Sequence, residues 1–199
     1  MLDVSNVFYI NLEHRHDRNR ECQQELNKLN TPYERFNAIK HEKGYIGCTM
    51  SHIKVLEMAI ERNLENYAVF EDDIVITQPE YLIREINAFI KSDTQFDVFI
   101  ICPRLENFVQ TKNKNIKKVL TALTTTAYIV NKHYYAKLLD NFKSGLDGLL
   151  NNKPRNRYAI DTHWVFLQRK DNWYCLSKRI GKQRAGYSDN SNRYEDYGC

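Results

Sequence analysis

Short segments of consecutive apolar residues alternate along the chain with segments in which apolar residues recur every three or four positions. The first pattern is typical of central strands covered on both faces, and the second is typical of helices packed on a sheet. Together they predict strands over 7–12, 33–39, 67–70, 96–102, 122–131 and 172–177. They also predict helices that end near Asn30 or cover roughly 49–63, 81–91, 132–142 and 161–170, with a two-glycine loop over 40–48. Alternating strands and helices predict an α/β sandwich with a mainly parallel central sheet.

Three carboxylates, Glu71, Asp72 and Asp73, directly follow the apolar strand in the segment NYAVFEDDIVI. Moving a carboxylate out of water is costly unless a cation, hydrogen-bond donors or a bound proton compensates for the loss of hydration. Ligands of open α/β sheets bind beyond the carboxyl ends of the strands, which is where this triplet lies. Hard oxygen ligands suit Mg²⁺ or Mn²⁺, which also neutralises a diphosphate leaving group. The triplet therefore predicts a divalent metal site, and a solvated acidic turn or a helix N-cap is the alternative.

The composition is that of a soluble globular protein, with 42% hydrophobic and 27% charged residues. A length of 199 residues corresponds to one domain, which we place at 1–184, followed by a C-terminal lid or tail at 185–199. The formal net charge of +4 mildly favours an anionic partner. Two basic segments, KNKNIKK at 112–118 and KRIGKQR at 178–184, are expected to be solvated loops.

The N-terminal segment lacks the basic-then-apolar layout of a signal peptide, and no apolar run approaches the length of about 20 residues that spans a bilayer. We therefore expect a cytoplasmic protein without a transmembrane segment, although peripheral membrane contact and the oligomeric state stay open. Five cysteines without a CxxC pair are expected to be reduced thiols or small core residues rather than a disulfide set or a zinc site: Cys22, Cys48, Cys102, Cys175 and Cys199.

Five segments resemble glycosyltransferase family 25, which includes lipooligosaccharide galactosyltransferases and collagen hydroxylysine galactosyltransferases. They are FYINLEHRHDR, GYIGCTMSHIKVLEMAI, YAVFEDDIVI, TTTAYIVNKHYYAKLL and IGKQRAGYSD, in the family's order and over nearly the whole chain. The resemblance implies the A-type glycosyltransferase fold, a Rossmann-like α/β/α sandwich. It also implies transfer of a sugar from a UDP-sugar donor, with a metal ion at the acidic motif and with inversion at the anomeric carbon.

The same resemblance implies roles for individual residues. Glu71 and Asp73 would bind the metal, most favourably Mn²⁺ with Mg²⁺ as the alternative, and Asp72 would orient the ribose or the donor sugar. The other donor-site residues would be Asn11, Leu12, Arg15 and Arg18 after the first strand, Ser51 and His52 at the start of the second helix, and Lys182, Gln183, Arg184, Ser188 and Asp189 near the C-terminus. Asn190 stands where the family commonly has an aliphatic residue. The packing of the last residues is therefore not inferred from the resemblance.

Asp161 and His163, in the segment AIDTHW, are candidates for the remaining chemistry. An inverting transferase needs a general base that takes the proton of the acceptor hydroxyl, and Asp or Glu usually serves. By position in the family Asp161 is the candidate base, and His163 is a candidate metal ligand. Exchanged roles or purely structural roles are the alternatives.

The leading hypothesis is a metal-dependent hexosyltransferase that uses a UDP-hexose and a glycan or glycoprotein acceptor. The choice between galactose and glucose depends on one or two hydrogen bonds that the sequence does not reveal. A non-catalytic nucleotide-sugar-binding module and a metal-dependent nucleotidyltransferase are alternatives. A nucleic-acid enzyme is disfavoured, because the aromatic residues are not interleaved with the basic clusters as in a base-stacking surface.

Overall fold

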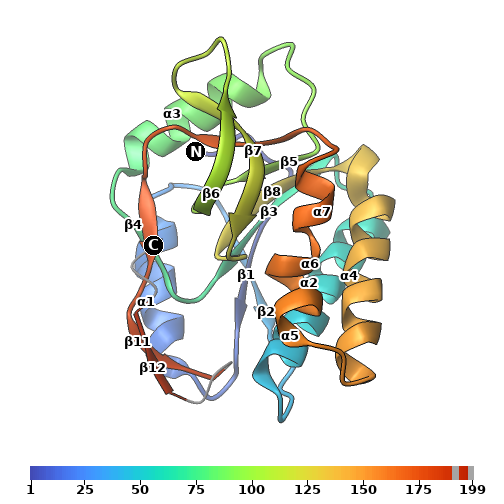
Figure 1. Cartoon of the computed structure of the whole chain (residues 1–199). Coiled ribbons are helices and arrows are strands. Elements are labelled where there is room, and N and C mark those ends of the chain that lie inside the picture. Colours follow the sequence, from blue (N-terminus) through green and yellow to red (C-terminus); the bar gives the residue numbers. More distant parts are fainter. Residues whose placement is uncertain (190–192, 197–199) are drawn as a thin grey trace.

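The structure, a computed structural model, describes residues 1–189 and 193–196 of the chain, and Asn190 and Cys199 lie outside the described residues (Figure 1). The strands are β1 (Val7–Asn11), β2 (Glu34–Asn37), β3 (Asn66–Glu71), β4 (Ile74–Ile76), β5 (Val98–Ile100), β6 (Arg104–Gln110), β7 (Ile116–Leu123), β8 (Ala127–Asn131), β9 (Trp173–Leu176), β10 (Gly181–Gln183), β11 (Gly186–Ser188) and β12 (Arg193–Glu195). The helices are α1 (His16–Asn27), α2 (Gly44–Glu61), α3 (Pro79–Ile90), α4 (Tyr135–Leu150), α5 (Arg155–Tyr158), α6 (Ile160–His163) and α7 (Val165–Gln168), with a 3₁₀ turn at Lys132–Tyr134.

The main sheet has eight strands in the order β2-β1-β3-β8-β5-β9-β7-β6. Strand β1 pairs in parallel with β2 and β3, and β5 pairs in parallel with β9. Strand β8 is antiparallel to both β3 and β5, and β7 is antiparallel to β9 and β6. All the strands except β8 and β7 therefore run in one direction, which confirms the mainly parallel sheet.

Two hydrophobic cores lie on opposite faces of this sheet. Side chains alternate between the faces along a strand. In β1, Phe8 therefore joins the core under α2 and α4, whereas Val7 and Tyr9 join the core under α1 and α3. Figure 1 shows α1 and α3 on one side of the sheet and α2, α4, α6 and α7 on the other. The arrangement is the predicted α/β/α sandwich.

Helix α2 begins at Gly44, so the prediction of a loop as far as residue 48 is wrong. Glycine is a poor helix former, which made the segment look like a loop. Position 47 nevertheless lies inside the helix. It is occupied by glycine because a Cβ there would collide with the backbone oxygen of Ile39. The helix consequently packs directly on the chain that follows β2, and this contact places the start of α2 beside the carboxyl end of β1.

The predicted strand over 122–131 is two strands, and the turn between them contains Thr124 with a φ of 72°. A positive φ is unfavourable for a β-branched residue, and such strained positions cluster at functional sites. The sequence prediction also missed β6, whose side chains are mostly exposed and carry no apolar period. Within the basic segment 112–118, Ile116 begins β7 and the residues before it form the turn of the β6–β7 hairpin.

Cys22, Cys48 and Cys175 are free thiols, as predicted. Among the described residues, no helix combines the length and the apolar character that crossing a bilayer requires.

Candidate functional site

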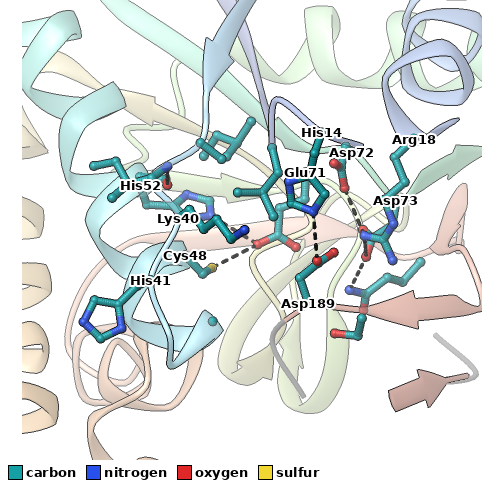
Figure 2. Close-up of a pocket in the computed structure, with 18 of the residues that line it drawn as sticks. His14, Arg18, Lys40, His41, Cys48, His52, Glu71, Asp72, Asp73 and Asp189 are labelled. Carbon is teal, nitrogen blue, oxygen red and sulfur yellow. Dashed lines mark hydrogen bonds and ion pairs between the residues drawn. The ribbon is translucent and has the colours of Figure 1, made fainter. Parts of the chain in front are cut away.

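A cavity of about 510 Å³ opens beyond the carboxyl ends of β1 and β3 (Figure 2). This volume is within the ordinary range of small-molecule sites, and the position is where ligands bind in open α/β sheets. Part of the lining is apolar and comes from the end of β1 and the residues after β2, namely Ile10, Leu12, Ala38 and Ile39. Much of the rest of the lining consists of charged side chains, including Arg18, Glu71, Asp72, Asp73 and Asp189.

The three carboxylates of the acidic triplet all line this cavity, but each has different partners. Both oxygens of Asp72 accept hydrogen bonds, Oδ2 from Asn11 Nδ2 at 2.7 Å and Oδ1 from Arg18 Nη1 at 3.0 Å. Burial raises the pKa of Asp72, although the charge of Arg18 and the bond from Asn11 oppose that rise. Asp72 is therefore held in place by the ends of β1 and α1, with its hydrogen-bonding capacity largely used.

The two carboxylate oxygens of Asp73 differ in their contacts. Oδ2 accepts a hydrogen bond from Gln183 Nε2 at 2.9 Å and lies 3.5 Å from Arg18 Nη1. Oδ1 is buried and has no hydrogen-bond partner among the residues that the structure describes. Burial, followed by the charge of Glu71, raises the pKa of Asp73 to about 7. A buried carboxylate with a free oxygen among like charges is an arrangement that a bound cation stabilises.

We predict that the metal-free protein loses stability as the pH rises from about 4 to 7. The pKa of Asp73 is about 7 in the folded chain against an ordinary value of 3.8, so in this window the folded state holds a proton that the unfolded state has released. The contribution of this one group falls by at most about 1.4 kcal/mol per pH unit and levels off above pH 7. Urea titrations in EDTA at several pH values measure it. The Asp73→Asn variant should show a shallower slope than the wild type, and equal slopes would contradict the prediction.

Glu71 ends β3 and faces α2 and the turn between β7 and β8. Its Oε1 lies 3.2 Å from His52 Nε2 and accepts a hydrogen bond from the Thr125 hydroxyl at 2.7 Å. The Cys48 thiol donates to the same oxygen at 3.7 Å. Burial alone would raise the pKa of Glu71, but the hydrogen bond and charge of His52, together with the hydrogen bonds from Thr125 and Cys48, hold the pKa below its ordinary value. Glu71 is therefore the one member of the triplet whose pKa its surroundings lower.

Asp161, on α6, meets the other side of the same β7–β8 turn. Its Oδ2 accepts a hydrogen bond from the backbone N–H of Thr124 at 3.3 Å. Burial, opposed by this hydrogen bond and reinforced by the charge of Glu71, raises the pKa of Asp161. The strained turn thus holds two carboxylates at once, Glu71 through Thr125 and Asp161 through Thr124.

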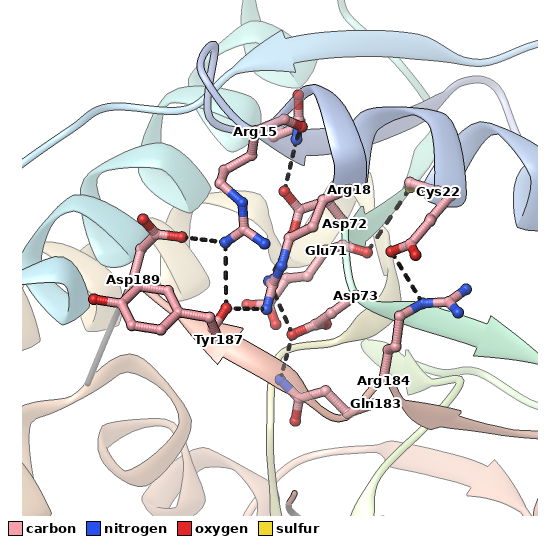
Figure 3. Close-up of polar contacts among 12 residues, drawn as sticks. Arg15, Arg18, Cys22, Glu71, Asp72, Asp73, Gln183, Arg184, Tyr187 and Asp189 are labelled. Carbon is pink, nitrogen blue, oxygen red and sulfur yellow. Dashed lines mark hydrogen bonds and ion pairs between the residues drawn. The ribbon is translucent and has the colours of Figure 1, made fainter. Parts of the chain in front are cut away.

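The C-terminal segment closes part of the cavity through two arginines of the α1 region (Figure 3). Strand β10 pairs with β4, which brings Gln183 opposite Ile74 and next to Asp73. Further on, the backbone oxygen of Tyr187 accepts hydrogen bonds from Arg15 Nη1 at 3.2 Å and from Arg18 Nη2 at 2.8 Å. Arg15 also pairs with Asp189 at 2.6 Å. The segment 185–189 is consequently tied to the loop after β1.

The structure brings together most, but not all, of the residues that the sequence singled out. In addition to the triplet, the cavity lining contains Leu12, Arg18, Ser51, His52, Gln183, Ser188 and Asp189. Asn11 and Arg15 contact this lining from behind, and Asp161 reaches it only through the β7–β8 turn. The Ser51 hydroxyl already donates to the Gly47 carbonyl at 2.7 Å and accepts from the Ile39 N–H at 2.9 Å, which fixes the chain after β2.

Three predicted site residues lie apart from the cavity lining. Lys182 is exposed on β10, and Arg184 pairs with Glu21 of α1 at 3.3 Å. His163 stacks on Tyr158 with 5.4 Å between the ring centroids, and its Nδ1 faces the Arg157 carbonyl oxygen. A role for His163 as a metal ligand therefore stays a prediction that this arrangement does not favour.

Several residues at the site were missed by sequence reasoning. Thr124 and Thr125 hold the two carboxylates described above, and the run of three threonines before an apolar strand was the only local signal for them. Lys40 and His41 line the cavity from a segment that looked like an ordinary loop. Cys48 lies four residues before His52, which is one helical turn. This spacing is visible in the sequence, but Cys48 was assigned to the two-glycine loop over 40–48 and not to the helix.

The sequence model of glycosyltransferase family 25, described as an LPS biosynthesis protein family, matches residues 42–150. This range includes α2, the acidic triplet and the β7–β8 turn. The lipooligosaccharide biosynthesis protein lex-1 of Haemophilus influenzae is 35% identical over 69 residues, which are 34% of this chain and 22% of that protein. The alignment thus spans less than a quarter of the length of that relative.

Solved structures share the fold at low sequence identity. A glycosyltransferase involved in glycosylation of the major capsid of PBCV-1 superposes with a TM-score of 0.51 at 12% identity, over 87% of this chain and 94% of that one. A UDP-glucose pyrophosphorylase superposes with a TM-score of 0.52 at 9% identity, over 89% and 75% of the two chains. These likenesses show the A-type glycosyltransferase fold. Because the family model matches more than half of the 199 residues, the chain belongs to glycosyltransferase family 25.

Proposed function

We propose that this protein is a metal-dependent hexosyltransferase that moves galactose or glucose from a UDP-sugar to a hydroxyl group of a glycan. The observation that carries the proposal is Asp73, which lines the ligand cavity with Glu71 and Asp72 and whose buried Oδ1 has no hydrogen-bond partner among the described residues. The description of the family and the name of the lex-1 relative support a lipopolysaccharide-type glycan as the acceptor.

The donor set of the triplet fits a hard divalent cation. Asp73 offers a free carboxylate oxygen, and Glu71 offers the oxygen that its three described contacts leave available. Asp72 is less suitable because both of its oxygens already accept hydrogen bonds. Glu71 and Asp73 would thus hold Mn²⁺ or Mg²⁺, which prefer oxygen ligands. When bound, the cation supplies positive charge that stabilises the UDP leaving group.

The remaining cavity residues fit the other parts of the donor. The apolar wall formed by Ile10, Leu12, Ala38 and Ile39 suits one face of the uracil ring. Arg18 points its guanidinium at the carboxylates of Asp72 and Asp73, where it would face a diphosphate group bound beside them. The pairing of Arg15 with Asp189 would hold the segment 185–189 over the bound nucleotide and reduce access of water to it.

Asp161 is the proposed general base. Its carboxylate would take the proton of the acceptor hydroxyl while that oxygen forms its bond to the anomeric carbon and the bond from this carbon to the UDP oxygen breaks. Attack from the face opposite UDP gives inversion. The Thr124 N–H would orient the carboxylate, and the raised pKa of Asp161 would make it a stronger base than an exposed aspartate.

The proposal is tested by donor hydrolysis with the purified protein. UDP release from a panel of UDP-sugars is measured with Mn²⁺, with Mg²⁺ and with EDTA, and a glycan acceptor is then added. We expect release from one preferred UDP-hexose, dependence on the metal and stimulation by the acceptor. Absence of release from every donor, together with UDP binding that is indifferent to metal, would instead identify a binding module that kept the fold.

A further inference from the structure

A thiol, an imidazole and a carboxylate converge at the back of the cavity, next to the acidic triplet. Cys48 and His52 are four residues apart on α2 and therefore share one face of the helix, and this face points at Glu71 (Figure 2). One ligand atom from each of these three residues lies within 4.8 Å of the other two. The cluster differs from the Glu71–Asp73 pair in its chemistry, because it offers sulfur and nitrogen as well as oxygen.

This donor set is that of a zinc site. Thiolate and imidazole ligands favour Zn²⁺, whereas Mg²⁺ and Mn²⁺ favour oxygen. Zinc sites with an open position have three protein ligands arranged as part of a tetrahedron, with Zn–N and Zn–O distances of about 2.0 Å and a Zn–S distance of about 2.3 Å. Such a tetrahedron separates N from O by about 3.3 Å and S from O by about 3.5 Å. The separations here are 3.2 Å from His52 Nε2 to Glu71 Oε1 and 3.7 Å from Cys48 Sγ to the same oxygen.

The residues behind the cluster orient its ligands as the outer shell of a metal site does. Histidine ligands of metals almost always hydrogen-bond through their second ring nitrogen, which fixes the tautomer and the ring plane. His52 Nδ1 lies 2.8 Å from the Tyr128 hydroxyl, and the two rings stack with 5.6 Å between their centroids. The Thr125 hydroxyl donates to Glu71 at 2.7 Å. With Nδ1 bonded to Tyr128, Nε2 faces Glu71 and the cavity, and a metal ion there would take the place of the Nε2 proton.

We propose that Cys48, His52 and Glu71 form a zinc-binding site whose fourth position opens into the cavity. Zinc deprotonates a coordinating thiol, so the neutral thiol of the metal-free chain is no obstacle. The site shares Glu71 with the cation proposed for the donor. One consequence, which rests on the proposed function, is that zinc competes with Mn²⁺ and inhibits sugar transfer.

The test uses cobalt as a spectroscopic probe in place of zinc, on the full chain, reduced and freed of metal. We expect one equivalent of Co²⁺ to give a thiolate-to-cobalt charge-transfer absorption in the near ultraviolet, which one equivalent of Zn²⁺ abolishes. The Cys48→Ser variant keeps every other cysteine and should lose this absorption and at least about a hundredfold in zinc affinity. The matched control Asp73→Asn removes the proposed Mn²⁺ ligand and should keep the absorption. Absence of the absorption in the wild type, or its persistence in Cys48→Ser, would overturn the proposal.

A second measurement needs no variant. Cys48 is half-buried and lines the cavity, so alkylation by iodoacetamide can be followed at that residue by peptide mass spectrometry. We expect zinc, but not magnesium, to slow alkylation of Cys48 at least about tenfold, because a coordinated thiolate is held by the metal. Equal rates with and without zinc would overturn the proposal. Neither experiment uses a UDP-sugar, so the zinc site and the transferase activity can fail independently.

Discussion

Replacing Asp73 with asparagine is expected to lower metal-dependent release of UDP by about two to three powers of ten, since a metal ligand contributes several kcal/mol to transition-state stabilisation. Asparagine has the same shape and keeps a carbonyl oxygen for the Gln183 amide, which donates to this position at 2.9 Å. The substitution therefore removes the charge with little change in packing. Initial rates with the preferred UDP-sugar over a range of Mn²⁺ concentrations measure the effect.

A matched control separates the loss of a ligand from the loss of a charge. Asp93 is exposed beyond the end of α3, and Asp93→Asn makes the same chemical change away from the cavity. We expect this control to retain wild-type rates and wild-type dependence on Mn²⁺. If Asp73→Asn also released UDP at the wild-type rate with an unchanged metal dependence, the triplet would not be the metal site.

The second large effect is expected at Asp161. Asp161→Asn should lower the rate of transfer by about 10²–10⁴-fold, which is the usual contribution of a positioned general base. Binding of UDP should change little, because Asp161 contacts the backbone of Thr124 and does not line the donor cavity. The measurements are kcat with donor and acceptor present, and the dissociation constant of UDP by calorimetry.

Two comparisons distinguish a base from a structural carboxylate. Asp140→Asn, at an exposed position of α4, is the matched control and should behave as wild type. In the Asp161→Asn variant, the rate of UDP release without acceptor should fall less than the rate of transfer. The reason is that attack by water does not require a proton acceptor at the position of Asp161. A fully active Asp161→Asn variant would remove this residue from the mechanism. A variant whose affinity for UDP falls by the same factor as its transfer rate would indicate a structural role.

Much of the fold followed from local pattern. Buried strands such as β1 and β3 contain uninterrupted apolar residues, at 7–10 and 67–70, because helices cover both faces of the sheet, so their positions were predictable. The β6–β7 hairpin was not readable, since β6 lies at the sheet edge and exposes most of its side chains. The start of α2 was also not predicted. Glycine is needed at position 47 because helix α2 packs closely on Ile39, and this tertiary contact cannot be recognised from the local sequence.

The candidate site divides in the same way. The sequence alone determined that three carboxylates follow a buried strand, that such a position faces ligands, and that the chain resembles family 25. Only the tertiary structure decided which carboxylate oxygen is free, because Asn11, Arg18 and Gln183 come from segments that are far apart in the chain. It also set Cys48 and His52 against Glu71, and Thr124 against Asp161. Hydrogen bonds and metal coordination depend on separations of a few ångströms between such segments, and local sequence carries no record of those distances.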